Sequence, residues 1–182
     1  MPVAENRYST TMTTETHYQY SIFKTRWGWF GLLGSDKGLV RTALPVAFKE
    51  AVERRLLSGI NHAEPAKKAF RPLEKQILAY YKGTPTEFAD VPACLENLTD
   101  FQQQVLRALR TVTYGHTVSY GELARTINNP RTSRAIGAVM ARNPLPLIIP
   151  CHRVIKTDGS LGYFSAPGGI DTKQRMLDLE KT

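Results

Sequence analysis

One of the two cysteines of this chain lies in the segment Leu147-Ile148-Ile149-Pro150-Cys151-His152-Arg153-Val154, directly before a histidine. An apolar run that is typical of buried backbone leads into the pair, and prolines at 144 and 150 make the segment rigid. Because the thiolate is the form of cysteine that attacks electrophiles, a cysteine beside an imidazole is a candidate nucleophile. A buried core cysteine is the competing interpretation, since cysteine is among the most often buried residue types. The rest of the sequence decides between them.

The composition is that of a folded globular protein, with 42% of the 182 residues hydrophobic and 22% charged. No apolar run approaches the roughly 18 residues of a membrane span, so we expect no membrane association. The first residues are rich in Ser, Thr and Glu and lack the apolar core of a secretion signal, which predicts a flexible tail over 1–16. We expect a cytoplasmic location, or a nuclear one if the source is eukaryotic.

The spacing of cysteines and histidines argues against a metal or a disulfide. Cys94 and Cys151 are the two cysteines, and a chain of this length needs no disulfide to stabilise its core. The histidines are scattered without pairs at ligand spacing, at His17, His62, His116 and His152. We therefore expect two free thiols, no metal site and no cofactor.

The net charge of +8 is concentrated in one stretch of the chain. Residues 101–157 hold one acidic residue, Glu122, against eight basic ones: Arg107, Arg110, Arg125, Arg131, Arg134, Arg142, Arg153 and Lys156. A basic surface can serve solubility alone, but this concentration favours a polyanionic partner such as nucleic acid. Cys151 lies in the same stretch, so the candidate nucleophile and the basic surface occur together in the sequence.

The N-terminal half is predicted to be a small α/β domain over 17–92. Segments rich in β-formers at 18–24, 27–33 and 39–44, with a turn at 35–38, predict a small antiparallel sheet. Apolar residues at helical spacing predict two helices, near 46–57 and 72–81. The segment 86–98 has no clear periodicity, so we expect it to connect this domain to a second one over 97–182.

The C-terminal half has the pattern of a helix-turn-helix. Thr99 or Asp100 can cap a first helix, and Ser119 with Glu122 three residues later forms a capping box for a second. A third helix is predicted over 131–142. Together with the N-terminal sheet, these helices predict an α+β protein with a mostly helical C-terminal domain. That domain would contain a DNA-binding unit similar to a winged helix-turn-helix.

The third predicted helix has two different faces. One face would pack inward through Ile136, Val139 and Met140. The other carries only small side chains after one arginine, at Arg134, Gly137, Ala138 and Ala141. A plain solvated helix would normally carry longer polar side chains at such positions. The small side chains therefore favour a face that docks closely on a flat or grooved partner.

The strongest pattern is the spacing of motifs around Cys151. Asn143-Pro144 precedes Ile149-Pro150-Cys151-His152-Arg153-Val154, and Gly168-Gly169 follows, with Lys173, Leu177 and Glu180 after it. In this arrangement the chain resembles the O6-alkylguanine-DNA alkyltransferases, also called methylated-DNA–protein-cysteine methyltransferases. The resemblance is close over residues 97–182. Residues 17–92 are similar to the variable N-terminal domain of that family only in layout.

The resemblance implies a catalytic group of four residues. Cys151 would accept the alkyl group from guanine O6 by in-line displacement, and His152 would withdraw the thiol proton through a bound water. Glu180 would hold the imidazole in the useful tautomer, and Asn143 would tie the third helix to the active-site strand. A methyl thioether is a poor leaving group and no second nucleophile is visible. Each molecule should therefore react once, as a monomer and without a cofactor.

The resemblance also implies that the partner is double-stranded DNA containing O6-alkylguanine. Arg134 would enter the base stack where the damaged nucleotide leaves, and Tyr120 would accompany the rotation of that base. Gly137 and Ala138 would form a smooth face toward the minor groove. Contacts to the DNA backbone are implied at Gln102, Gly121, Asn129 and Thr157. The substrate pocket is implied at Met140, Pro150, Val154, Tyr163, Phe164 and Ser165.

One segment departs from the family pattern, because Ala166-Pro167 looks inserted before Gly168-Gly169. The pair Tyr163-Phe164 then offers two candidates for the tyrosine of the pocket. If Phe164 takes that position, the pocket lacks a hydroxyl group. Ser165 would present its backbone N–H to guanine O6, in a register that the insertion leaves open.

Three other functions stay open on the sequence. An alkyltransferase-like, lesion-binding module would lack the acceptor cysteine, which this chain retains as Cys151. A transcription regulator would need bulky polar side chains on its third helix, where this chain has Gly137 and Ala138. A cysteine hydrolase would turn over repeatedly and would need an oxyanion hole, for which the sequence offers no candidate.

Overall fold

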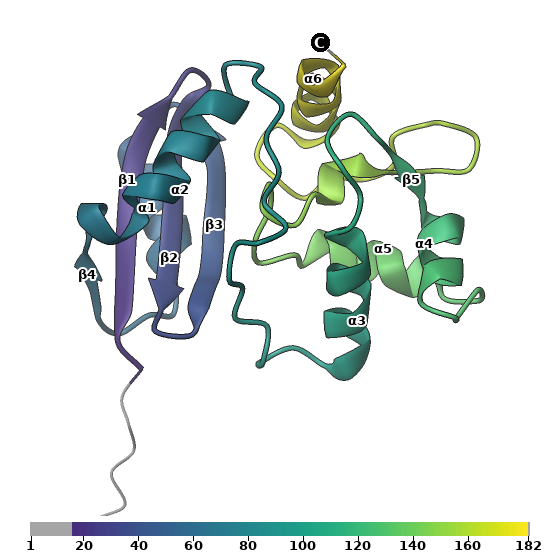
Figure 1. The fold of residues 1–182 in the computed structure, drawn as a ribbon, viewed down its shortest axis with the longest axis horizontal. Helices are drawn as coiled ribbons and strands as arrows, with labels where there is room; N and C mark the ends of the chain where they lie inside the picture. The colour runs from purple at the N-terminus through teal and green to yellow at the C-terminus, as the bar shows by residue number, and fades with distance from the viewer. Residues whose placement is uncertain (1–15, 182) are drawn as a thin grey trace, which may run out of the picture.

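The computed structural model describes residues 16–181, which form an N-terminal sheet with its helices and a C-terminal group of helices (Figure 1). Residues 1–15 of the predicted tail lie outside the described residues. The N-terminal elements are β1 (Tyr18–Thr25), β2 (Gly28–Ser35), β3 (Gly38–Val46), α1 (Lys49–Leu57), β4 (Ala63–Pro65) and α2 (Lys67–Tyr80). The C-terminal elements are α3 (Asp100–Leu109), β5 (Val118–Ser119), α4 (Tyr120–Thr126), α5 (Ser133–Ala141), the 3₁₀ helix η1 (Cys151–Arg153), β6 (Val154–Ile155) and α6 (Gly169–Glu180). The predicted α+β class is confirmed.

The N-terminal sheet has the order β3-β2-β1-β4 and is mixed, which corrects the prediction of an antiparallel sheet. β1, β2 and β3 form the expected antiparallel meander. β4 pairs parallel to β1, because α1 carries the chain from β3 across one face of the sheet to its opposite edge. With three residues and a proline, β4 has no alternating pattern that sequence analysis could detect.

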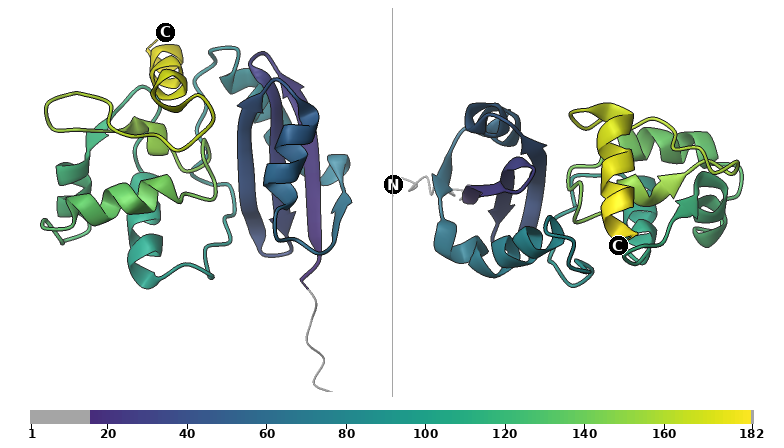
Figure 2. Two further views of the ribbon diagram at one scale, coloured as in Figure 1. Left: turned by 180° about the vertical axis from the view of Figure 1, so that it is seen from behind. Right: turned by 90° about the horizontal axis from the view of Figure 1, so that it is seen from above.

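Helices cover both faces of this sheet (Figure 2). α1 packs closely against β2, where a Cβ at Gly31 would lie 2.7 Å from Val52. On the other face, Phe70 of α2 lies against Gly34. Glycine at these two positions of β2 therefore lets both helices approach the strand.

Both N-terminal helices begin at residues other than those predicted. α1 starts at Lys49, three residues late, because Val46 completes β3. α2 starts at Lys67, five residues before the predicted start, and contains Pro72. The prediction rested on apolar residues at helical spacing, which does not fix where a helix begins. The packing of Phe70 on the sheet offsets the backbone hydrogen bond that Pro72 cannot make.

The C-terminal helices begin at the predicted caps. Thr99 and Gln102 form one capping box at α3, and Ser119 and Glu122 form another at α4. α5 is shorter than the predicted 131–142, since its first helical residue is Ser133 and its last is Ala141. The turn between α4 and α5 completes the helix-turn-helix.

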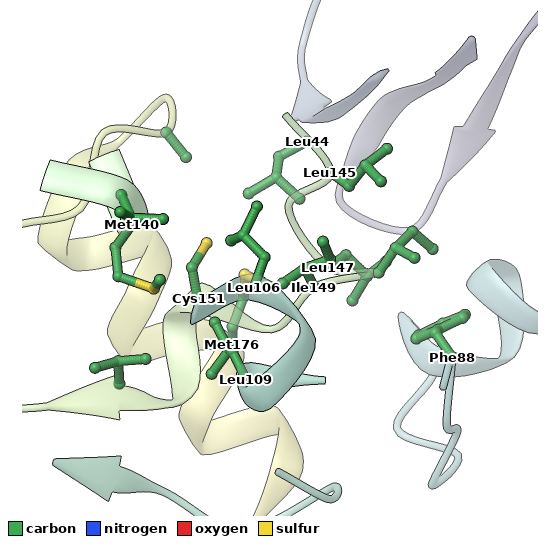
Figure 3. Packing of buried hydrophobic residues seen from close by; sticks show 14 of the residues in the cluster. Leu44, Phe88, Leu106, Leu109, Met140, Leu145, Leu147, Ile149, Cys151 and Met176 are labelled. Carbon is green, nitrogen blue, oxygen red and sulfur yellow. The ribbon is translucent and has the colours of Figure 1, made fainter. Parts of the chain in front are cut away.

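The two halves share a hydrophobic core. One cluster of buried side chains includes Phe30 and Leu44 of the sheet, Leu145 and Cys151 of the C-terminal half, and Met176 of α6 (Figure 3). At the sheet edge, Thr42 donates from its backbone N to the carbonyl of residue 144 at 2.9 Å and from Oγ1 to that of residue 146 at 2.8 Å. β3 therefore supports the segment that leads into the candidate nucleophile.

Candidate functional site

Cys151 begins η1, immediately after the buried run 145–150. Its side chain belongs to the core cluster together with Met140 of α5 and Met176 of α6 (Figure 3). Only 5% of the residue is exposed, which is the burial of an ordinary core cysteine. Its polar neighbours are what distinguish it.

His152 follows directly and is completely buried, with Nε2 2.7 Å from Oε1 of Glu180 at the end of α6. A carboxylate accepts hydrogen bonds, so Nε2 carries the ring hydrogen and Nδ1 keeps the lone pair that can take a proton. Nδ1 has no hydrogen-bond partner among the described residues. The structure therefore contains the predicted pairing of His152 with Glu180 and leaves the basic ring nitrogen available.

Glu180 is held by more donors than the sequence predicted. Arg153 donates from Nε to Oε2 at 2.9 Å and from Nη2 to Oε1 at 3.0 Å, and the backbone N of Gly115 donates to Oε2 at 3.2 Å. Tyr80 of α2 donates to Oε1 at 2.9 Å. Burial alone would raise the pKa of the Glu180 carboxyl, but the hydrogen bonds from His152 and Arg153 and the positive charge of Arg153 hold it at about 2. Glu180 is therefore ionised at physiological pH.

The thiol and the imidazole are both neutral in the resting protein. Burial raises the pKa of the Cys151 thiol, against smaller opposing effects of Asn143 and Lys173. Burial also lowers the pKa of His152, although Glu180 opposes that shift. Little thiolate is present before an electrophile binds, so the thiol proton must move to the imidazole during the reaction.

Asn143 connects α5 to the reactive segment. Its Nδ2 donates to the carbonyl of Ile149 at 2.8 Å, and its Oδ1 accepts from the backbone N of Leu145 at 3.0 Å. These are the hydrogen bonds that the resemblance implied, but they reach a loop and not the expected active-site strand. Pro150 has no N–H to donate to a strand ladder, which accounts for the difference. The C-cap of α5 is Arg142, one residue before Asn143.

A cleft opens beside the helix-turn-helix and gathers six of the predicted residues. They are Tyr120, Gly121, Arg134, Gly137, Thr157 and Tyr163, and the lining also includes Ser133, Lys156 and Gly162. Arg134 and Ala138 are exposed on α5, and Gly137 and Ala141 are half-buried beside them. Ile136, Val139 and Met140 are buried on the opposite side, as predicted. The outer face of α5 therefore carries only small side chains, apart from that of Arg134.

Tyr120 lines this cleft, whereas the buried Cys151 does not. Burial raises the pKa of the Tyr120 hydroxyl, and the charge of a thiolate at Cys151 would raise it further.

Three predicted DNA-binding residues lie outside the cleft lining, namely Ala138 on the exposed face of α5, Gln102 and Asn129. The Gln102 side chain accepts a hydrogen bond from the backbone N of Thr99 at 2.9 Å and so helps to begin α3. The carbonyl of Asn129 accepts from Oγ1 of Thr132 at 2.7 Å in the turn before α5. Gln102 and Asn129 have local structural roles that the sequence analysis did not assign to them.

Residues 100–182 match the family model described as "6-O-methylguanine DNA methyltransferase, DNA binding domain". The methylated-DNA–protein-cysteine methyltransferase of Methanosarcina acetivorans is 38% identical over 164 residues, covering 88% of this chain and 97% of the relative. The chain belongs to the methylated-DNA–protein-cysteine methyltransferase family. The Mycobacterium tuberculosis methyltransferase of the same name is 46% identical over 121 residues, which are 66% of this chain and 71% of the relative.

Solved structures agree with this methyltransferase assignment over most of the chain. The Mycobacterium tuberculosis protein OGT, crystallised in complex with DNA, has a TM-score of 0.73 and 37% identity, covering 90% of this chain and 93% of its own. The O6-methylguanine-DNA methyltransferase of Pyrococcus kodakaraensis has a TM-score of 0.69 and 25% identity, covering 91% of this chain and 99% of its own. The fold similarity therefore includes the N-terminal half, for which the sequence analysis found only a similarity of layout.

In this member of the methyltransferase family, the two candidates for the pocket tyrosine point to different environments. Tyr163 is 72% exposed and lines the cleft, whereas Phe164 is buried in the core. The cleft therefore has a tyrosine hydroxyl, and Ser165 next to the pair is exposed. The other residues assigned to the pocket, Met140, Pro150 and Val154, are buried and do not line the cleft.

The two residues that looked inserted form the turn before α6. The carbonyl of Ala166 accepts from the backbone N of Gly169 at 2.9 Å, and that of Pro167 accepts from Oγ1 of Thr172 at 2.6 Å. Gly168 has a φ of 81°, in the left-handed region that favours glycine. The extra length is thus used to begin the helix that carries Glu180.

Lys173, like Arg153 and Tyr80, was given no role by sequence analysis. It is completely buried, and Nζ donates to the carbonyls of Val154 and Leu161. Burial lowers the pKa of Lys173 to about 8, and a thiolate at Cys151 would raise it. A sequence signal did exist, because Lys173 and Glu180 are seven residues apart and share one face of a helix.

Metal-binding and membrane-spanning features are absent from the described part of the chain. Within residues 16–181, no three His, Cys, Asp or Glu side chains are placed to hold a metal ion. No helix in that range is long and apolar enough to cross a bilayer. Cys94 and Cys151 are both free thiols.

Proposed function

We propose that this protein repairs O6-alkylguanine in duplex DNA and that Cys151 is the acceptor of the alkyl group. The sulfur attacks the alkyl carbon in line with the bond to guanine O6. The S–C bond forms as the C–O bond breaks, and the electron pair stays on O6. The thiol proton moves to Nδ1 of His152 and then to the guanine ring, so that the repaired base leaves neutral. Glu180 stabilises the imidazolium between these two steps.

The observation that carries this proposal is the buried hydrogen bond that joins Glu180 to His152, the residue next to Cys151. A cleft beside the helix-turn-helix, lined by Tyr120 and Arg134, adds a surface on which DNA could lie. A nucleophile with its own base supports alkyl transfer, and the smooth face of the helix supports close approach to DNA. The retained Cys151 argues against a purely lesion-binding role.

Access to guanine O6 requires that the nucleotide rotate out of the duplex, because the atom lies inside the base stack. Rotation costs a few kcal/mol and is easier for a mispaired base. Arg134 is exposed on α5 and lines the cleft, which supports a role in filling the space that the base leaves. Gly137 and Ala138 read no base edge, which suits a protein that must act in any sequence.

The same chemistry determines how and where the protein works. A thioether on Cys151 is a poor leaving group, so we infer that each molecule acts once. A compartment that keeps thiols reduced and contains DNA is required, which is the cytoplasm or, in a eukaryote, the nucleus. All the proposed groups belong to one chain, so a monomer is sufficient.

We expect a duplex with one O6-methylguanine to add the mass of a single CH₂ group to the peptide that contains Cys151. Protein and lesion should be consumed in equal amounts, because the thioether does not break. Mass spectrometry of the digested protein measures the transfer, and a duplex with unmodified guanine is the control. Tight binding without transfer would identify a lesion-binding module, and repeated turnover would identify a hydrolase.

Replacing Arg134 with alanine should slow alkyl transfer from duplex DNA by about tenfold to hundredfold, because the extruded state loses the side chain that fills the stack. DNA affinity should fall by less, since one cation among several is removed. Single-turnover rates and fluorescence anisotropy measure the two effects. Arg131→Ala is the matched control, because Arg131 is another exposed arginine and lies in the turn just before α5. Equal losses of rate and affinity in Arg134→Ala would contradict the proposed role.

A further inference from the structure

The N-terminal half places one side chain directly on the catalytic carboxylate. Tyr80 is the last residue of α2, and its hydroxyl donates to Oε1 of Glu180 at 2.9 Å. The same oxygen lies 2.7 Å from Nε2 of His152. Tyr80 is completely buried, so this hydrogen bond is shielded from water.

The ring of Tyr80 is held by aromatic contacts that leave its hydroxyl little freedom. It meets Tyr81 edge-on at a centroid distance of 5.2 Å and Tyr114 at 6.0 Å, and Phe88 lies at 6.1 Å. Burial first, and then the charge of Glu180, raises the pKa of Tyr80 well above its usual value. The hydroxyl therefore stays protonated and acts as a donor at every pH at which the protein works.

The other polar groups around Glu180 do not replace this donor. Arg153 binds both carboxylate oxygens, but it also donates to the carbonyl of Val112 and lies 3.8 Å from Glu87. Tyr114 donates to the carbonyl of Leu179 and not to the carboxylate. The charge of Arg153 acts on both carboxylate oxygens of Glu180. Tyr80 adds a neutral donor to Oε1, which is the oxygen that His152 contacts.

The titratable and charged groups that act on His152 come from η1 and α6 of the described structure. Glu180 faces Nε2, while Arg153 and Lys173 are cations close enough to disfavour the imidazolium, and Cys151 is the adjoining thiol. In this setting, the charge density on Oε1 of Glu180 controls how strongly His152 holds a proton. A donor on that oxygen withdraws charge from it and makes His152 a weaker base.

We propose that Tyr80 is a positioning residue of the alkyl-transfer site, which fixes the Glu180 carboxylate on His152 and lowers the proton affinity of the imidazole. This inference rests on the proposed function. It makes the N-terminal half a contributor to the reaction, since α2 supplies a group that the C-terminal half lacks. A weaker base takes up the thiol proton less readily but releases it more readily to the departing guanine. Loss of the hydrogen bond should therefore slow the reaction through a less well fixed carboxylate and a slower release of the proton.

The test uses Tyr80→Phe, which removes the hydroxyl and keeps the ring in its aromatic contacts. We expect the single-turnover rate with an O6-methylguanine duplex to fall by about threefold to tenfold, the effect of one lost buried hydrogen bond. The acid limb of the pH–rate profile and the pKa of His152, followed by NMR, should both move up by about half a unit. DNA affinity should stay unchanged.

Tyr81→Phe is the matched control, at the next residue of the chain. Its hydroxyl is buried and has no hydrogen-bond partner among the described residues, so its removal should change neither the rate nor the pH profile. If Tyr80→Phe behaves like Tyr81→Phe, or loses rate without any shift in the acid limb or in the pKa of His152, the inference is wrong. A wild-type protein that transfers no alkyl group would refute the proposed function instead, while the NMR titration would still report on Tyr80.

Discussion

Replacing Glu180 with glutamine should abolish alkyl transfer and lower the free energy of unfolding by about 3–5 kcal/mol, because it removes one partner of a buried ion pair. Arg153 is almost fully buried, and Glu180 accepts two of its N–H groups. A neutral amide leaves that guanidinium without its charge partner and turns an NH₂ group toward other donors. His152 loses the anion that stabilises its protonated form. Urea unfolding and the single-turnover assay measure the two losses.

The control for Glu180→Gln is the same substitution at an exposed ion pair. Glu96 lies 2.7 Å from Lys37, with both side chains more than half exposed. Such pairs contribute about 0–1 kcal/mol, so Glu96→Gln should leave stability and transfer almost unchanged. A similar cost in the two variants would show that the buried network around Glu180 does not stabilise the fold.

The pH dependence of stability should distinguish the wild type from Glu180→Gln. The pKa of Glu180 is about 2 in the folded protein, below its usual value of 4.5. A lowered carboxyl pKa contributes stability that is present above pH 4.5 and is lost as the pH falls toward 2. The difference in stability between wild type and variant should therefore shrink over that range. Unfolding curves recorded at successive pH values would show it.

Much of the fold could be predicted from the sequence because its determinants are local. The meander of β1 to β3 follows from β-formers separated by turns, and the starts of α3 and α4 follow from capping boxes at Thr99 and Ser119. β4 was missed because its three residues are specified by pairing with β1 and not by any pattern of their own. The start of α2 at Lys67 was not predicted, because the first turn is stabilised by packing of Phe70 on the sheet and not by a local pattern.

The candidate site was predictable only where its residues lie in one motif. Cys151 and His152 are adjacent, and Glu180 was found by its spacing within a family pattern. Tyr80 lies 100 residues before Glu180, and nothing in the local sequence indicates that the two meet. Arg153 was visible in the motif, but its partner depends on how α6 packs against η1. The long-range contacts between buried polar groups are therefore the part of this site that could not be predicted from the sequence.

Replacing Cys151 with serine should reduce alkyl transfer by at least about a thousandfold, the scale of losses seen when a nucleophile is removed. A hydroxyl is a much weaker acid than a thiol, and an imidazole that is hydrogen-bonded to Glu180 cannot deprotonate it readily. Binding to a lesion-containing duplex should persist, because Cys151 does not line the cleft and serine has nearly the same side-chain volume as cysteine. Single-turnover mass spectrometry and anisotropy measure the two properties.

Cys94→Ser is the matched control, since Cys94 is the other free thiol and lies half-buried in the connection between the two halves. Its backbone N donates to the carbonyl of Leu39 and so holds the loop on the sheet, and the charged pair near it is the exposed Lys37–Glu96 pair. Transfer should therefore proceed at the wild-type rate in Cys94→Ser, with the alkyl group on Cys151. If transfer survives in Cys151→Ser but not in Cys94→Ser, Cys94 is the acceptor and the proposed mechanism is wrong.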